Sequence, residues 1–221
     1  MTQQRAINTR SEIIAAAAQE FAEHGYAAAS INNIIDNSTR TKGALYFHFS
    51  SKQALAQAVL EQVRSLYTPI VERWRNAPVH PFDAISGIVH DIAAQASNVL
   101  MRADARLAVD QPSTELERPS SVWEAAIGDL AVRAESAGYL CGDFTAERFT
   151  RFLVATLAGH RMLAEMVPAT THQPDHALHF ADTVETLIRA ATAQQHTRAQ
   201  SAAGERAAFA TAGIKGEVTA Q

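Results

Sequence analysis

The chain of 221 residues contains a single cysteine, Cys141. It can form no disulfide within the chain, and it lacks the cysteine partners that zinc sites use. No uninterrupted apolar run approaches the ~20 residues of a membrane-spanning helix. The first residues, MTQQRAINTRSE, contain no apolar core of a signal peptide. We therefore expect a cytoplasmic protein that does not associate with a membrane.

Motifs of the common enzyme classes are also missing. The sequence has no nucleophile elbow, no phosphate-binding loop and no dinucleotide fingerprint, so it predicts no catalytic residue and no cofactor. A metal site is a weaker alternative, because His172, His176 and His179 fall within the run HQPDHALH. Pro174 separates the first histidine from the other two, and exposed histidines are the simpler interpretation. We expect no metal and no enzymatic activity.

Signals of β-structure are absent as well, since no sustained apolar–polar alternation and no Asn-Gly or Asp-Gly hairpin dipeptide occur. The sequence therefore predicts an all-α protein. Its first helix is expected to start at Thr9, whose spacing from Glu12 fits a capping box. Apolar residues at helical spacing follow, and Gly25 is expected to end the helix.

Two short helices and a long one are predicted next. Ser30 is suited to cap the second helix, and residues 37–39 break it because their side chains compete for backbone hydrogen bonds. The third helix is expected from Thr41 to about His48, and Ser50 or Ser51 would cap the long fourth helix. Residues 9–49 thus have the layout of a helix-turn-helix unit.

The rest of the chain is predicted to alternate between helices and loops. Residues 76–82 and 110–120 each hold two prolines and are expected to be loops. One fifth helix between them is expected to carry apolar residues as far as Val99. Later helices are expected near 121–137, from a cap at Thr145 and at about 175–193. A flexible tail would follow, because residues 194–221 have little apolar bulk.

Positive charge is concentrated at the N-terminal end, although the whole chain has a net charge of −4. Residues 1–60 have a net charge of +1, and the remainder has −5. The acidic residues of the first part fall mainly within residues 12–23. The basic residues are therefore expected to share a face without them. These basic residues are Arg5, Arg10, Arg40, Lys42 and Lys52.

The run TKGALYFHFSSK, residues 41–52, gathers aromatic and basic residues around a glycine. On a helix, Leu45 and Phe49 face inward, and Phe47 is expected to join them in the core. Lys42 and Gly43 fall on another side, together with Tyr46.

That other side suits DNA. A lysine beside free backbone N–H groups at the start of the third helix favours phosphate oxygens. Tyr46 and His48 can donate hydrogen bonds to phosphates or base edges. Lys52 would add a phosphate contact. Such a unit places its third helix in the major groove.

The same run closely resembles the recognition helix of TetR-type transcriptional repressors, and EFAEHGYAAASINNII, residues 20–35, resembles the two preceding helices. The resemblance covers about residues 7–62. The run TKGALYFHF is most similar to the γ-butyrolactone autoregulator receptors, a subfamily that governs secondary metabolism in filamentous soil bacteria. The residues that match the family pattern are Phe21, Gly25, Tyr26, Ser30, Thr41, Lys42, Gly43, Tyr46, His48, Phe49 and Lys52.

This resemblance implies a helix-turn-helix DNA-binding domain at 1–52 and a helical ligand-binding and dimerisation domain at 53–193. The protein would bind double-stranded operator DNA as a homodimer, paired through its last two long helices. The residues expected to serve DNA binding are Arg5, Arg10, Ser30, Arg40, Thr41, Lys42, Gly43, Tyr46, His48 and Lys52.

A small effector, lactone-like or antibiotic-like, would release the repressor from DNA. PSSVWEAAI, residues 119–127, resembles the subfamily's stretch with a pocket tryptophan, which makes Trp123 the first candidate for ligand binding. Thr156 matches a position near the ligand, and Arg106 and His160 are weaker candidates. A helical regulator that acts through protein partners, with altered DNA binding, is the alternative.

One departure from the family pattern motivates that alternative. Relatives usually carry Ala-Gly-Val where this chain has Ser38, Thr39 and Arg40. An unpaired charge does not sit inside a small core. Either the stem of Arg40 packs while its guanidinium reaches toward phosphate, or the turn is rearranged.

Overall fold

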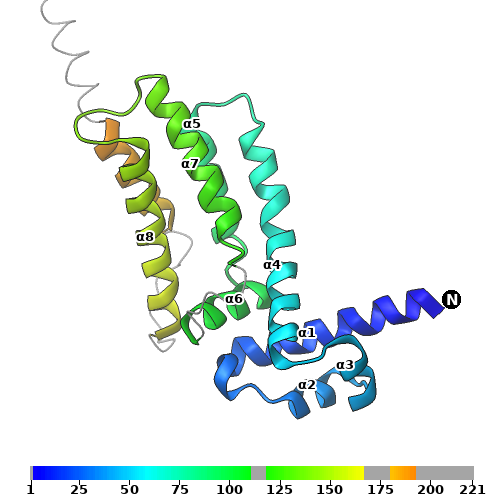
Figure 1. Ribbon diagram of the computed structural model, residues 1–221. Helices are drawn as coiled ribbons and strands as arrows, with labels where there is room; N and C mark the ends of the chain where they lie inside the picture. Colours follow the sequence, from blue (N-terminus) through cyan, green and yellow to red (C-terminus); the bar gives the residue numbers. More distant parts are fainter. Residues whose placement is uncertain (1, 111–117, 167–179, 193–221) are drawn as a thin grey trace, which may run out of the picture.

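The computed structural model describes residues 2–110, 118–166 and 180–192, and within these ranges every regular element is a helix (Figure 1). The all-α prediction is confirmed. Residues 180–192 form a helical segment beside α8. The other helices are α1 (Thr2–Ala28), α2 (Ile31–Ser38), α3 (Lys42–His48), α4 (Lys52–Arg75), α5 (Pro81–Ala93), α6 (Val99–Asp110), α7 (Ser121–Ser136) and α8 (Ala146–Met166).

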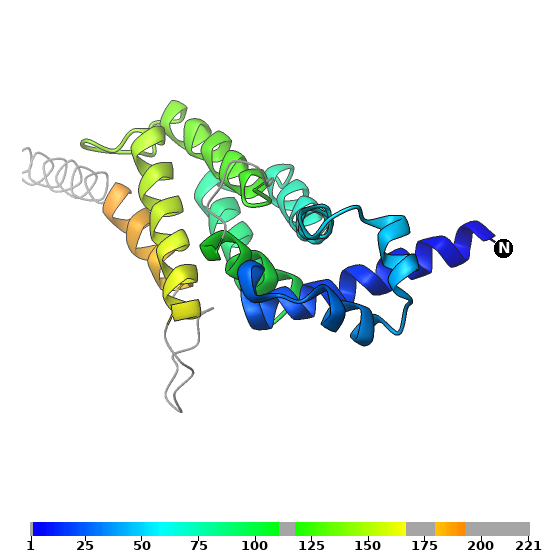
Figure 2. The same cartoon turned by 60° about the horizontal axis from the view of Figure 1, so that its bottom comes forward.

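Two apolar cores share the long helix α4. The first core lies among α1, α2, α3, the beginning of α4 and two residues of α6. The second core lies among the rest of α4, the helices α5, α7 and α8, and the segment 180–192. Figures 1 and 2 show α1–α3 at one end of the molecule, with α6 between them and the longer helices. The first core therefore carries the predicted DNA-binding unit, and α6 connects it to the second.

The helix-turn-helix unit is capped as the sequence predicts. Ser30 Oγ accepts a hydrogen bond from the Asn33 N–H at 3.5 Å, and Thr41 Oγ1 accepts one from the Ala44 N–H at 3.2 Å. Thr39 adopts φ 54°, which ends α2 and turns the chain into α3. Ser51, the second of the two serines considered, caps α4. The four boundaries arise from these local hydrogen bonds.

The predicted start of the first helix is wrong, because α1 begins at Thr2 and includes Thr9 as an interior residue. Residues 2–8 continue the helix outward, so no cap is needed at Thr9. The predicted stop is confirmed: Gly25 leaves the helical conformation with φ 71° and ψ −178°. Only glycine adopts this region of backbone conformation readily.

The single fifth helix expected to extend to Val99 is also wrong, because α5 ends at Ala93 and α6 begins at Val99. Asn98 Oδ1 accepts a hydrogen bond from the Leu100 N–H at 3.0 Å and so starts a new helix. The apolar residues keep helical spacing through both helices, so the sequence pattern does not indicate the break between them. The preceding loop is shorter than predicted, because Pro81 is the first residue of α5, where its missing N–H costs nothing.

The later helices follow the prediction where the structure describes them. Gly138 follows α7 with φ 73°, and Thr145 Oγ1 accepts a hydrogen bond from the Arg148 N–H at 3.1 Å at the start of α8. Most of the loop 110–120, the three histidines of HQPDHALH and the expected tail lie outside the described residues. Within the described part, no helix combines the length and apolar character needed to cross a membrane.

Candidate DNA-binding surface and effector site

The aromatic residues in and directly after α3 differ in how deeply they are buried. Leu45 and Phe49 are buried against α1 and α4, as expected. Phe47, expected in the core, is instead 82% exposed. Successive helical residues are 100° apart, so a residue two positions after Leu45 points nearly to the opposite side. The core position of Phe47 is therefore a wrong prediction.

The exposed residues of α3 form one continuous surface, which we call the α3 face: Lys42, Gly43, Tyr46 and Phe47. Their spacing of one, three and four residues places them on adjoining rows of a helix. Tyr46 is 49% exposed. The face thus combines a cation, an open glycine and two aromatic rings.

Three further residues of the predicted DNA-binding set, Ser30, Thr41 and His48, make contacts within the protein. The hydroxyls of Ser30 and Thr41 accept the capping hydrogen bonds of α2 and α3. His48 is half-buried, and its ring lies edge-on to Phe47 with 5.1 Å between ring centroids. Predicted DNA contacts from these three residues remain predictions.

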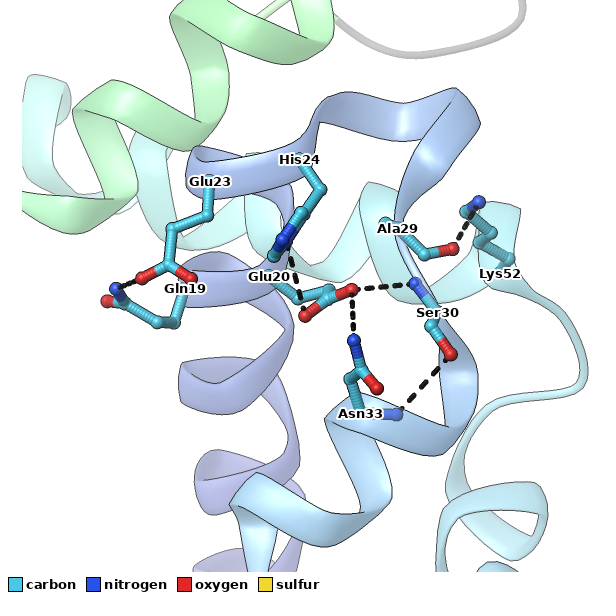
Figure 3. A network of polar contacts seen from close by, with 8 residues as sticks. All are labelled: Gln19, Glu20, Glu23, His24, Ala29, Ser30, Asn33 and Lys52. Atoms are coloured by element: carbon cyan, nitrogen blue, oxygen red, sulfur yellow. Dashed lines mark hydrogen bonds and ion pairs between the residues drawn. The ribbon is translucent and has the colours of Figure 1, made fainter.

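A buried carboxylate fixes the entry into α2. Glu20 is 2% exposed, and its Oε1 accepts hydrogen bonds from the Ser30 N–H at 2.7 Å and from Asn33 Nδ2 at 3.2 Å (Figure 3). Its other oxygen lies 3.5 Å from His24 Nδ1. A buried charge needs such partners. This role was not predicted, because in the sequence Glu20 is one of the acids grouped within residues 12–23.

Lys52 is placed differently from expectation. Its ammonium donates hydrogen bonds to the backbone carbonyls of Ala29 at 2.7 Å and Ala27 at 3.2 Å. It also lies 4.9 Å from the ring centroid of Tyr26. Partial burial lowers the pKa of Lys52, and the negative charge of Glu20 opposes that shift. Lys52 therefore ties the start of α4 to the end of α1, and a phosphate contact from it is untested.

Arg40 forms an ion pair with Glu12 of α1. The expectation that the acids of residues 12–23 stand apart from the basic face is wrong at this point. The guanidinium is neither buried in the unit nor unpaired toward solvent. Its side chain is 37% exposed, so Arg40 is accommodated at the surface. Thr39, where relatives carry glycine, adopts the left-handed φ of 54°.

The other two arginines of the predicted set lie on α1. Arg10 is 5.3 Å from the ring centroid of Phe49 and 3.9 Å from Glu61. Arg5 is exposed in the outer part of α1 that projects beyond α3 in Figure 1. The predicted basic residues therefore come from α1, α3, α4 and the turn before α3, and Arg10 and Arg40 are already paired to acids.

The second core holds a buried polar cluster that the sequence did not reveal. Asp104 of α6 is 4% exposed and lies 2.6 Å from Arg161 Nη2 of α8. Tyr67 of α4 donates its hydroxyl hydrogen to the same carboxylate oxygen at 3.3 Å. Burial raises the pKa of Tyr67 strongly, and the charge of Asp104 adds to the effect. This cluster ties together α4, α6 and α8.

Trp123 of α7 lies beside this cluster. It is 4% exposed, and its Nε1 has no well-formed hydrogen-bond partner among the described residues. The indole is close enough to the Tyr67 hydroxyl to act against the rise in the tyrosine pKa. A buried indole N–H usually has an acceptor, so Trp123 is suited to receive one from a bound molecule.

The other predicted ligand residues have contacts of their own. Thr156 lies on the exposed side of α8, and its hydroxyl donates to the Phe152 carbonyl at 2.8 Å. His160 Nε2 lies 2.9 Å from Thr183 Oγ1 in the segment 180–192. Arg106 lies near the end of α1, with its Nε 3.2 Å from where a β-carbon on Gly25 would be. The ligand roles of these residues stay predictions.

Three helices with this capped turn and exposed third helix define a helix-turn-helix regulator of transcription. Residues 13–59 match the family model of bacterial regulatory proteins, tetR family. The crystal structure of full-length TylP, a TetR regulator from Streptomyces fradiae, is 32% identical in sequence. That similarity covers 86% of this chain and 82% of TylP, with a TM-score of 0.60. The chain therefore belongs to the TetR family of transcriptional regulators.

Other relatives place it near one branch of that family. The A-factor receptor protein of Streptomyces griseus is 29% identical over 164 residues, which are 74% of this chain and 57% of the relative. A γ-butyrolactone receptor described as ArpA-like is 26% identical, with 83% of this chain and 98% of the receptor covered and a TM-score of 0.61. The resemblance to γ-butyrolactone receptors inferred from TKGALYFHF is thus confirmed.

Proposed function

We propose that this protein is a ligand-responsive repressor that binds operator DNA as a homodimer and is released by a small molecule. The effector is a γ-butyrolactone-like signal or a pathway product, and the regulated genes serve secondary metabolism. The observation that carries the proposal is the α3 face, which is exposed on a helix capped at both ends and anchored by the buried Leu45 and Phe49.

The surroundings of the α3 face support DNA as its partner. Lys42 and Tyr46 supply a cation and a phenolic hydroxyl, which suit phosphates and base edges. Arg5 lies on the projecting part of α1, at some distance along the molecule. Residues 1–52 would thus act as the DNA-binding domain, and residues 53–193 would bind the effector and the second copy.

An exposed apolar strip on α8 supports a homodimer. Phe152 and Leu163 are 45% and 58% exposed, and Thr156 and Gly159 lie between them at helical spacing. Among the described residues, no atom lies within 4 Å of where a β-carbon on Gly159 would be, so another helix can approach closely there. Two copies paired through this strip would present two recognition helices, as successive major grooves about 34 Å apart require.

The effector is expected at Trp123. Its N–H, which makes no well-formed hydrogen bond among the described residues, favours a molecule with a hydrogen-bond acceptor, such as a lactone or ketone oxygen, within an apolar body. Asp104 beside it belongs to α6, and α6 packs along α1. Binding near Trp123 would then favour a different position of α6 and of the DNA-binding unit. Operator and effector would oppose each other by linkage.

Gel-shift titration tests the proposal. Purified protein is added to the DNA upstream of its own gene at several salt concentrations, and the complex is then titrated with synthetic γ-butyrolactones and with culture extracts. We expect a specific complex that weakens steeply with salt and dissociates with one class of effector. A complex that survives every candidate contradicts release by ligand, and absence of any complex contradicts DNA binding.

A Trp123→Phe variant tests effector binding separately from operator binding. It retains the apolar volume and removes the N–H donor. Operator affinity should be unchanged, while a higher effector concentration should be needed for release. Equal effector sensitivity in the variant and the original protein would rule out Trp123 as the donor.

A further inference from the structure

We propose that Gly43 and Phe47 together recognise the 5-methyl group of a thymine in the major groove, and so set part of the operator sequence. The inference rests on the proposed DNA-binding function and adds a specific base contact to it. It is based on two features of α3 that the folding of the protein does not require.

The first feature is the exposure of Phe47. At 82% it is the most exposed large apolar side chain among the described residues. The ring is not free to take any orientation, because His48 lies edge-on against it at 5.1 Å and 82° between planes. An exposed aromatic ring held in place by a neighbour suits an apolar contact with a partner.

The second feature is the absence of an internal reason for Gly43. It has no positive φ, so its backbone conformation is open to any residue. In the part of the chain that the structure describes, a β-carbon added there would meet only Thr41 Oγ1, at 4.0 Å. Alanine would fit, and it would favour the helix. The glycine is therefore explained by something outside the protein that approaches the backbone closely.

Gly43 and Phe47 lie four residues apart, so they occupy the same row of the helix one turn from each other. At Gly43 no side chain covers the backbone, and the ring of Phe47 lies one turn further along the same row. Lys42 and Tyr46 border the pair with a cation and a hydroxyl. An apolar contact bordered by phosphate-binding and base-binding groups fits the edge of a base better than the surface of another protein.

Thymine is the base that fits. In the major groove it presents a methyl group, the apolar feature by which an A·T pair is distinguished there. The uncovered backbone at Gly43 leaves room for that methyl group, and the ring of Phe47 contacts the methyl group. Cytosine carries only a hydrogen at the corresponding C5 position, so it offers Phe47 no methyl group to contact.

Thymine-to-uracil scanning tests the contact, because uracil lacks only the methyl group. A duplex bound by the protein is selected from its upstream DNA, and each thymine is replaced by deoxyuridine in both half-sites. Fluorescence anisotropy then gives the Kd for the original protein, Phe47→Ala, Phe47→Leu and Val132→Ala. Val132 is a control because it is exposed on α7, away from α3.

For the original protein, we expect the Kd to rise about fourfold at one thymine per half-site, the usual effect of losing one buried methyl group. Phe47→Ala should bind more weakly overall and show no change at that thymine. Phe47→Leu should retain part of the effect, and Val132→Ala should behave as the original. Thermal melting of each variant checks that folding is unchanged.

Gly43→Ala gives an independent result, because it should raise the melting temperature while weakening the thymine duplex. Uracil at the contacted position should restore part of that loss. If the original protein binds the duplex and no uracil changes its Kd, the thymine contact is wrong and the DNA-binding function stands. If no duplex is bound, the proposed function itself fails.

Discussion

Asp110 at the end of α6 occupies the space beside Gly25 of α1. A β-carbon on Gly25 would lie 1.8 Å from Oδ2 of Asp110 and 3.2 Å from Nε of Arg106. The helix α1 of the DNA-binding unit and α6, which joins the two cores, thus meet where α1 has no side chain. The backbone conformation at this contact favours glycine, and any side chain there would have to displace the Asp110 carboxylate.

Gly25→Ala is expected to destabilise the protein by about 1–3 kcal/mol, because φ 71° with ψ −178° is strained for alanine. Urea unfolding measures the change. In the double variant Gly25→Ala/Asp110→Ala the steric clash is removed, so part of the loss should be recovered and the backbone strain should remain. A single variant as stable as the original would contradict this role.

Glu20→Ala is expected to lower the free energy of unfolding by about 1–3 kcal/mol, since it leaves the Ser30 N–H and the Asn33 amide without their acceptor. Operator affinity should fall with it, because α2 loses its attachment to α1. Glu23→Ala is the matched control: Glu23 is exposed and bonds only Gln19 among the contacts in Figure 3. Its effect should stay within about 0.5 kcal/mol, and a similar loss in both variants would refute the special role of Glu20.

Glu12→Gln is expected to release Arg40 for DNA while changing stability by at most about 1 kcal/mol, as for other surface ion pairs. Affinity at low salt should rise, and the slope of log K against log salt should steepen by about 0.9, the value for one added phosphate contact. Adding Arg40→Val to this variant should abolish the gain. An unchanged slope in Glu12→Gln would show that Arg40 faces no phosphate even when unpaired.

Arg161→Met is expected to cost about 3 kcal/mol, because it leaves the buried carboxylate of Asp104 without its cation. The double variant Asp104→Leu/Arg161→Met should recover most of this loss, since apolar residues can replace a buried ion pair. Thermal or urea unfolding gives both values. Additive losses in the double variant would mean that the two residues act independently.

Leu163→Glu is expected to separate the proposed dimer, because it places a charge in the exposed apolar strip of α8. Sedimentation velocity should show a monomer with an unchanged helical spectrum, and operator affinity should fall. Val132→Glu on α7 is a matched control, since Val132 is similarly exposed. A dimer that persists in Leu163→Glu would place the interface elsewhere.

Local sequence predicted the helix-turn-helix well. Ser30, Thr41 and Ser51 act within three residues of their own positions, and the spacing of Leu45 and Phe49 is enough to bury them. The break before α6 was missed because apolar spacing continues across it, and only the hydrogen bond from the Asn98 side chain distinguishes a new helix.

The contacts that sequence could not supply join distant residues. Glu12 and Arg40 are separated by 28 residues, and Asp104 and Arg161 by 57. A pattern along one helix shows which side is polar, but it does not show which partner the fold brings there. The same limit explains why Thr156 and Trp123, both expected at one ligand, belong to different surroundings.

Because α1 is long, a small rotation of the helix at Gly25 would move its N-terminal end over a much larger distance. Arg5 lies twenty residues before Gly25 on the same helix, which is about 30 Å at 1.5 Å per residue. If α1 turned by about 5° around its contact with α6, Arg5 would travel about 3 Å, roughly the length of one hydrogen bond. A small rotation where α1 meets α6 would therefore become a displacement of a basic residue by several ångströms at the far end of the DNA-binding unit.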